Sequence, residues 1–148
     1  MLSKKVMNDI EEYLYIYPNF EQKIEDIKRE SEIVIKRDVN SWIKSKGKIN
    51  NSVECQALLE LITEEKINKC LKWKAVIEKV MKIFSKYYPE RYLYINLKYK
   101  DKCTITKIEM KSCMSKSTQS RIKQEILYYI AIFAFKENLI KLDEEYDI

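Results

Sequence analysis

The chain has 148 residues, 46% of them apolar, and a formal net charge of +5, which is enough apolar material for one domain or two small ones. One glycine and two prolines argue against a strand-and-turn architecture, because such folds need these residues at their many reversals, so an all-α fold is expected. No apolar run approaches the ~20 residues of a membrane span, and the mild positive charge suits a polyanionic partner.

The first residues predict two helices joined by a tight turn. Apolar side chains recur at helical spacing over residues 3–17, Pro18 ends this helix, and Asn19 is placed to cap a second helix that ends near residue 35. Gln22 stands where a capping box places a side chain that bonds back to the N-cap backbone. Two helices joined so closely predict a helical hairpin.

The middle of the chain predicts a linker and a long helix. Residues 36–51 hold the only glycine, Gly47, and three asparagines, which is typical of a connection. Ser52 is expected to cap a helix extending to about residue 86. Its apolar residues recur on more than one face, which favours either one helix contacted on several sides or two helices meeting near residues 63–68. Coiled-coil dimerisation along it is a further alternative.

Pro89 predicts the first turn of another helix, which extends to Lys98. Residues 104–123 then predict two short helices separated by a turn at residues 112–114, with Thr104 and Ser115 as their N-caps. This layout is typical of a helix-turn-helix, whose second helix lies in the DNA major groove. The side chains expected to form its small core are Ile105, Ile108, Met114, Ile122 and Ile126.

Residues 114–123, Met-Ser-Lys-Ser-Thr-Gln-Ser-Arg-Ile-Lys, resemble the recognition helix of the RinA/ArpU family of phage late-transcription regulators, which has the pattern Ser-x-x-Thr-x-x-Arg-Ile-Lys. That helix belongs to a domain that is similar to region 4 of the sigma-70 factors. The resemblance continues in order through residues 17–27 and 72–80. The chain departs from this pattern at two positions. Cys113 stands where many such turns have glycine, and Gln119 stands where the residue is usually small or apolar.

The resemblance implies an all-α chain in which an N-terminal helical hairpin and a long helix, residues 1–88, precede a sigma-region-4-like helix-turn-helix domain, residues 89–148. It implies a sequence-specific DNA-binding phage regulator in the bacterial host cytoplasm, which activates late genes by binding promoter DNA and contacting host RNA polymerase. The N-terminal helices would contact the polymerase, a second subunit in a homodimer, or both.

The residues expected to contact DNA come from both helices of the motif. Arg121 is placed to recognise guanine through two hydrogen bonds, while Lys107, Lys111 and Lys123 are expected at phosphates. Residues 102–135 hold six basic and two acidic side chains, whereas residues 136–148 carry a net charge of −3. The whole predicted set is Thr104, Lys107, Lys111, Ser115, Lys116, Ser117, Ser120, Arg121, Lys123 and Gln124.

Two other functions are kept as alternatives. A sigma-like subunit that directs polymerase itself would use the same DNA-contacting residues. A small terminase subunit for DNA packaging also pairs a helix-turn-helix with helical oligomerisation segments, but its DNA-binding domain normally comes first in the chain. The absence of histidine and of any Cys-x-x-Cys pair predicts no catalytic residue, metal site or cofactor, and the four cysteines are expected as reduced thiols.

Overall fold

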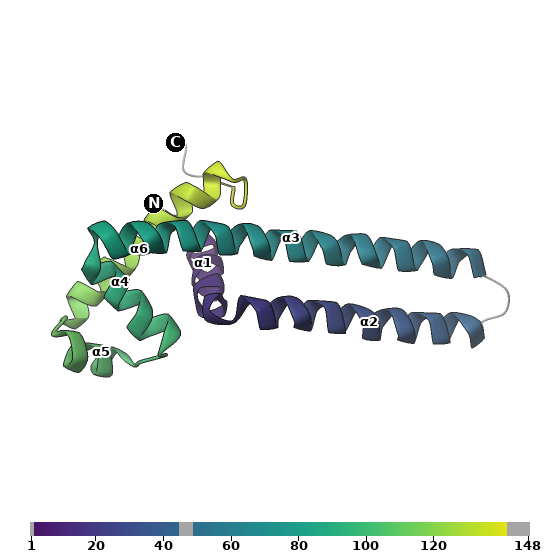
Figure 1. Cartoon of the computed structure of the whole chain (residues 1–148), viewed down its shortest axis with the longest axis horizontal. Helices are drawn as coiled ribbons and strands as arrows, with labels where there is room; N and C mark the ends of the chain where they lie inside the picture. The colour runs from purple at the N-terminus through teal and green to yellow at the C-terminus, as the bar shows by residue number, and fades with distance from the viewer. Residues whose placement is uncertain (1, 45–48, 142–148) are drawn as a thin grey trace. The chain divides into compact units, whose positions relative to one another are not determined.

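The computed structural model of the chain describes the backbone of residues 2–44 and 49–141 and, within these, the side chains outside residues 34–53. Every regular element in these ranges is a helix, and no strand occurs there, as expected for an all-α fold (Figure 1). No helix of the described part is both long and apolar enough to cross a bilayer. The chain divides into two compact units, Met1–Pro18 with Lys72–Ile148 (unit 1), and Asn19–Leu71 (unit 2).

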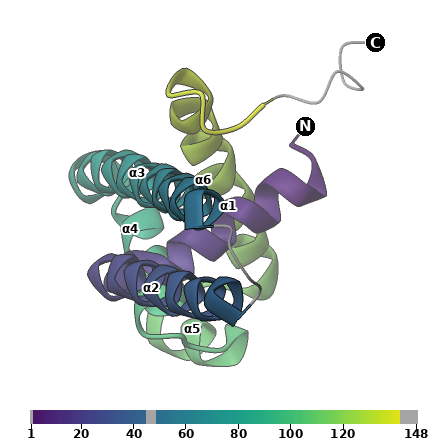
Figure 2. The ribbon, with the colours of Figure 1, turned by 90° about the vertical axis from the view of Figure 1, so that its right-hand side faces the viewer.

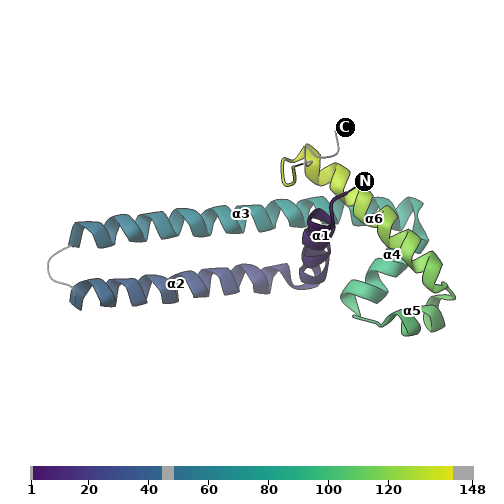
Figure 3. The same ribbon diagram turned by 180° about the vertical axis from the view of Figure 1, so that it is seen from behind.

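Unit 1 holds the helices on either side of unit 2 in the sequence. Helix α1 (Lys4–Ile16) lies within the predicted range, and its N-cap is Ser3, whose hydroxyl accepts a hydrogen bond from the Val6 N–H at 3.2 Å. Helix α3 (Ile49–Tyr87) enters unit 1 at Lys72, and α4 (Pro89–Ile95) starts with proline in its first turn, as predicted. A π-helical turn (Asn96–Lys100) follows, and then α5 (Ile105–Ser112) and α6 (Lys116–Lys136), which Figure 3 shows from behind.

The core of unit 1 forms where these helices pack on α6. Trp73 of α3 is buried and stacks on Tyr13 of α1, with ring centroids 4.6 Å apart. Arg91 of α4 lies 3.3 Å from the Glu125 carboxylate of α6, which adds a polar link between these two helices. The apolar side chains with no more than 1% of their surface exposed are Ile10, Leu14, Trp73, Ile77, Val80, Phe84, Tyr99, Ile108, Ile126, Leu127, Ile130 and Ala134.

Unit 2 is a pair of helices. Helix α2 (Phe20–Lys44) lies beside the first part of α3 in Figure 1, and Figure 2 shows both helices nearly end on. The Thr63 hydroxyl of α3 donates a hydrogen bond to the Ser31 hydroxyl of α2 at 2.8 Å, so the Thr63 side of α3 faces α2. Only Phe20 and Cys70 are buried among the described side chains of unit 2.

This pairing corrects several predictions for the N-terminal half. The helices expected to form a hairpin, α1 and α2, are joined by a 3-10 turn (Tyr17–Asn19) and belong to different units, while within unit 2 helix α2 pairs with α3. The second helix continues to Lys44 and does not end near residue 35. Gln22 Nε2 donates a hydrogen bond to the Asp26 carboxylate at 3.0 Å, and the predicted capping-box bond of the same side chain stays a prediction.

The single long helix, one of the two alternatives that the sequence left open, is confirmed, but it begins earlier than expected. Helix α3 is unbroken from Ile49 to Tyr87, so no helix boundary occurs at residues 63–68, and Ser52 lies inside the helix and not at its cap. Within the predicted linker, residues 36–44 and 49–51 are helical, while the expected loop around Gly47 lies outside the described residues. The compact units group the residues differently from the ranges 1–88 and 89–148, which stay a prediction about domains.

Candidate nucleic-acid interface

Helix α5 begins and ends through local hydrogen bonds. The Thr104 hydroxyl accepts from the Lys107 N–H at 3.3 Å, which satisfies one of the free donors at the start of the helix. At the other end, Cys113 has φ 60° and ψ 21°, and its N–H donates to the Glu109 carbonyl at 2.9 Å. This left-handed conformation is the one that glycine normally supplies at a helix C-terminus, so the turn accommodates a side chain there.

Helix α6 begins only three residues later, at a cluster of hydroxyl groups. The Ser115 hydroxyl accepts from the Thr118 N–H at 3.3 Å and lies 3.1 Å from the Ser117 hydroxyl and 2.9 Å from that of Thr118. Ser115 itself has extended backbone angles, as an N-cap requires. The predicted caps Thr104 and Ser115 are therefore both confirmed.

Gln119 fixes the second helix against the first. Its side chain is 3% exposed, and its Nε2 donates to the carbonyls of Ile105 at 3.1 Å and of Met114 at 3.0 Å. The amide thereby links α6 to the start of α5 and to the turn. The sequence contains the signal for this burial, because residues 119, 122 and 126 follow helical spacing on one face.

The predicted core between the two helices is mostly confirmed. Ile108, Met114, Ile122 and Ile126 are all buried. Ile105 was expected to join them, but its side chain is 55% exposed. As the first residue of α5, it contributes its backbone carbonyl to the contact with α6 while its side chain points outward.

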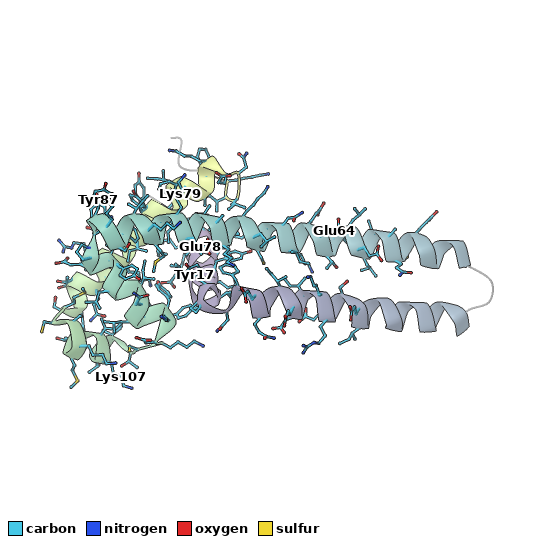
Figure 4. The ribbon with its side chains drawn as sticks, viewed as in Figure 1. Tyr17, Glu64, Glu78, Lys79, Tyr87 and Lys107 are labelled. Atoms are coloured by element: carbon cyan, nitrogen blue, oxygen red, sulfur yellow. The ribbon has the colours of Figure 1, made fainter. Side chains whose placement is uncertain are left out.

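The outer face of the two helices carries the predicted polar and basic side chains. Figure 4 shows Lys107 extending away from α5. On α6, residues 117, 121 and 124 share one arc of the helix, because successive residues are about 100° apart. Exposed members of the predicted set are Thr104, Lys107, Lys111, Ser115, Lys116, Ser117, Ser120, Arg121 and Gln124.

The same outer arc of α6 becomes apolar in its second half. Tyr128, Ile132 and Phe135 continue the line of residues 117, 121 and 124, and they are 57%, 42% and 48% exposed. The face of α6 thus changes from polar and basic to aromatic and aliphatic after Gln124. The polar and basic side chains of this arc are therefore confined to the first part of the helix.

Lys123 is the member of the predicted set that does not belong to this face. Its Nζ lies 2.9 Å from Glu11 Oε1 of α1, and the same oxygen accepts a hydrogen bond from the Tyr99 hydroxyl at 3.1 Å and lies 3.6 Å from Lys98 Nζ. On α6, Lys123 lies in the arc that contains the buried Ile122 and Leu127. The phosphate contact expected of Lys123 stays a prediction, and the ion pair with Glu11 gives the same ammonium a different role.

Partial burial shapes the acid–base behaviour of the Glu11 cluster. Burial raises the pKa of Glu11, but the hydrogen bond from Lys123 and the charges of both lysines outweigh it and hold the pKa below its ordinary value of 4.5. Burial lowers the pKa of Lys98, and the charge of Lys123 adds to this effect. Burial, with the nearby Glu11 charge, raises the pKa of Tyr94 to about 12 and raises the pKa of Tyr99 as well.

The described residues contain no group of three or more histidine, cysteine, aspartate or glutamate side chains arranged to hold a metal ion. No protein-family model, curated protein or solved structure matches the chain. Its function therefore has to be inferred from the chemistry of its own surface.

Proposed function

We propose that α5, the turn at Cys113 and α6 form a helix-turn-helix that binds promoter DNA, and that the chain is a sequence-specific phage transcriptional regulator that contacts bacterial RNA polymerase. The observation that carries this proposal is the exposed row at the start of α6. Ser117, Arg121 and Gln124 lie on one arc of a helix whose position is fixed by the buried Gln119. Such a row is what direct readout of base edges requires.

The length of this row also supports the proposal. The polar part of α6, residues 116–124, is about 13 Å long at 1.5 Å per residue, which is enough for about two and a half turns to lie in a major groove, whose width of about 12 Å admits an α-helix. Arg121, near its middle, offers the paired donors that recognise guanine, while serine hydroxyls and the Gln124 amide adapt to other bases. Beyond Gln124 the outer arc is apolar, so this part of the helix would lie outside the groove.

Exposed lysines flank the row. Lys107 and Lys111 extend from α5 and Lys116 from the first turn of α6, and all three are exposed. The free N–H groups and the positive end of the helix dipole at the start of α6 favour a phosphate at the same place. These groups would neutralise the DNA backbone on both sides of the bases that the row reads.

The experiment is selection of bound duplexes from a random library with the full chain, followed by titration of the selected and a scrambled duplex at several salt concentrations. Three phosphate contacts by lysine predict a slope of log K against log salt of roughly −3. The triple variant Lys107→Ala/Lys111→Ala/Lys116→Ala should weaken binding to both duplexes and flatten the slope.

The matched control removes the same charge elsewhere. Lys28, Lys72 and Lys82 are also exposed, and their triple alanine variant should bind nearly as the unmodified chain does. Equal losses in the two variants would make binding a general charge effect and overturn the proposal. Transcription reconstituted with polymerase core, with and without the host sigma factor, then separates an activator from a sigma-like subunit.

A further inference from the structure

The described side chains of unit 2 form little core. Its two helices contribute only Phe20 and Cys70 as buried side chains among those described, although amphipathic helices gain most of their stability from packing an apolar face. A hydrophobic core normally forms between two packed layers of secondary structure, and a pair of helices supplies only one such layer. The apolar side chains left on its outside therefore need an explanation.

Those side chains gather on the face of α3 that points away from α2. Thr63 marks the face toward α2 through its hydrogen bond to Ser31, and Leu61 lies about 200° around the helix from Thr63. Leu58 and Ile62 lie beside Leu61 on the same face, within an arc of about 100°. Their exposed fractions are 59% for Leu58, 58% for Leu61 and 40% for Ile62. We call these three residues the α3 stripe.

The charges around the α3 stripe are self-complementary. Glu54 precedes Leu61 by seven residues and Lys69 follows Ile62 by seven residues, so both lie about two turns from the centre of the stripe and on its face. Both side chains are exposed. A two-fold axis between Leu61 and Ile62 would bring Glu54 of one copy opposite Lys69 of a second, antiparallel copy, and this contact would occur twice.

We propose that the α3 stripe binds the α3 stripe of a second copy of this chain, with the two helices antiparallel. Leu61 of each copy then packs against Ile62 of the other, and the Glu54–Lys69 pairs fix the register at both ends. Glu65 stands four residues before Lys69, so the ammonium lies between carboxylates of both copies. The same axis brings Glu65 opposite Leu58 of the other copy, so the apolar contact is centred on Leu61 and Ile62 and ends at this position. The result is a four-helix arrangement in which each α2–α3 pair supplies the layer that the other lacks.

This inference does not depend on DNA binding, and its test uses no DNA. The mass of the full chain is measured by sedimentation over a wide concentration range, with 17.9 kDa as the monomer. The unmodified chain should reach twice that mass with increasing concentration. Leu61→Glu should raise the dissociation constant at least tenfold, because two carboxylates would enter the apolar centre. Leu71→Glu is the matched control, since Leu71 is 45% exposed but lies outside the arc of the stripe.

Charge reversal tests the register. Glu54→Lys and Lys69→Glu should each raise the dissociation constant about fivefold at low salt, and the double variant should restore it. A chain that stays monomeric overturns the proposal, as does a dimer that tolerates Leu61→Glu. Failure of the double variant to restore dimerisation overturns the antiparallel pairing. Helical circular dichroism confirms that each variant is folded.

Discussion

Lys123 of α6 and Glu11 of α1 form an ion pair, with 2.9 Å between Nζ and Oε1. The pair joins the N-terminal helix to the helix that we propose reads DNA. Their side chains are 37% and 20% exposed, so water screens the interaction only in part. A lysine expected from its sequence context at the DNA backbone is thereby assigned a structural contact within unit 1.

Lys123→Ala should therefore act on stability more than on DNA binding. We expect the free energy of unfolding to fall by about 1 kcal/mol, because Glu11 loses its nearest charged partner while remaining partly hydrated. The salt dependence of DNA binding should stay unchanged, whereas Lys116→Ala should lower its slope by roughly one. Urea denaturation and duplex titration measure the two effects. A flattened slope for Lys123→Ala would place its ammonium on a phosphate in the complex.

The Glu11 cluster should make stability depend on pH in mild acid. Because the pKa of Glu11 is lower in the folded chain than its ordinary value of 4.5, its stabilisation is complete above that value and is lost as the pH falls through the folded-state pKa. In the Glu11→Gln variant, the free energy of unfolding should fall less between pH 7 and pH 3 than in the unmodified chain. Denaturation midpoints from pH 7 to pH 3 test it, with the exposed Glu12→Gln as control. A difference between the unmodified chain and Glu11→Gln that stays constant over this range contradicts the assignment.

Gln119→Ala should destabilise unit 1 by about 2–3 kcal/mol, because two hydrogen bonds are lost and a small cavity forms. Gln119→Glu should cost more, since a carboxylate would face the carbonyl oxygens of Ile105 and Met114 without a donor. Gln124→Ala, at an exposed position, should change stability by less than about 0.5 kcal/mol. Thermal melting followed by circular dichroism measures all three variants. Equal losses of stability from Gln119→Ala and Gln124→Ala would contradict the conclusion that Gln119 holds α6 against α5.

Cys113→Gly should raise the free energy of unfolding by about 0.5–1 kcal/mol, because glycine adopts φ 60° without the steric cost that a Cβ atom brings. Cys113→Val should lower it by about 1 kcal/mol, since β-branched side chains fit this region poorly. The opposite signs make the pair of substitutions diagnostic. Denaturant titration gives both values, and a loss of stability in the glycine variant would mean that the thiol makes a contact of its own.

Arg121→Ala should weaken binding to the selected duplex by about 1–3 kcal/mol and relax the preference at one base pair, because a bidentate contact with guanine would be lost. Selection repeated with the variant shows the relaxed position directly. Binding to scrambled DNA should change much less. The same loss on both duplexes would assign Arg121 to the phosphate backbone.

Local chemistry explains what the sequence could predict. The N-caps Thr104 and Ser115 and the first-turn Pro89 were identified because capping involves residues within one helical turn. The all-α class followed from the scarcity of glycine and proline. The core between α5 and α6 was found for Ile108, Ile122 and Ile126 because they repeat at helical spacing.

Long-range packing explains most of what was missed. Which helices pair depends on contacts between distant residues, so the short connection between α1 and α2 could not predict that α2 pairs with α3. The Glu11–Lys123 pair has no sequence signal, since its members lie on opposite ends of the chain. Ile105 was misplaced because one helical turn does not fix the rotation of so short a helix. The DNA contacts themselves stay predictions.

The left-handed residue that ends α5 also provides a chemical reporter. Cys113 is exposed, Cys55 and Cys103 are half-buried, and burial raises the pKa of the Cys70 thiol. A thiol reagent should therefore modify Cys113 first. Cys113 lies between the two helices of the proposed motif. The rate of its alkylation, compared with and without a DNA duplex, therefore measures how closely DNA covers the turn, and no substitution is needed.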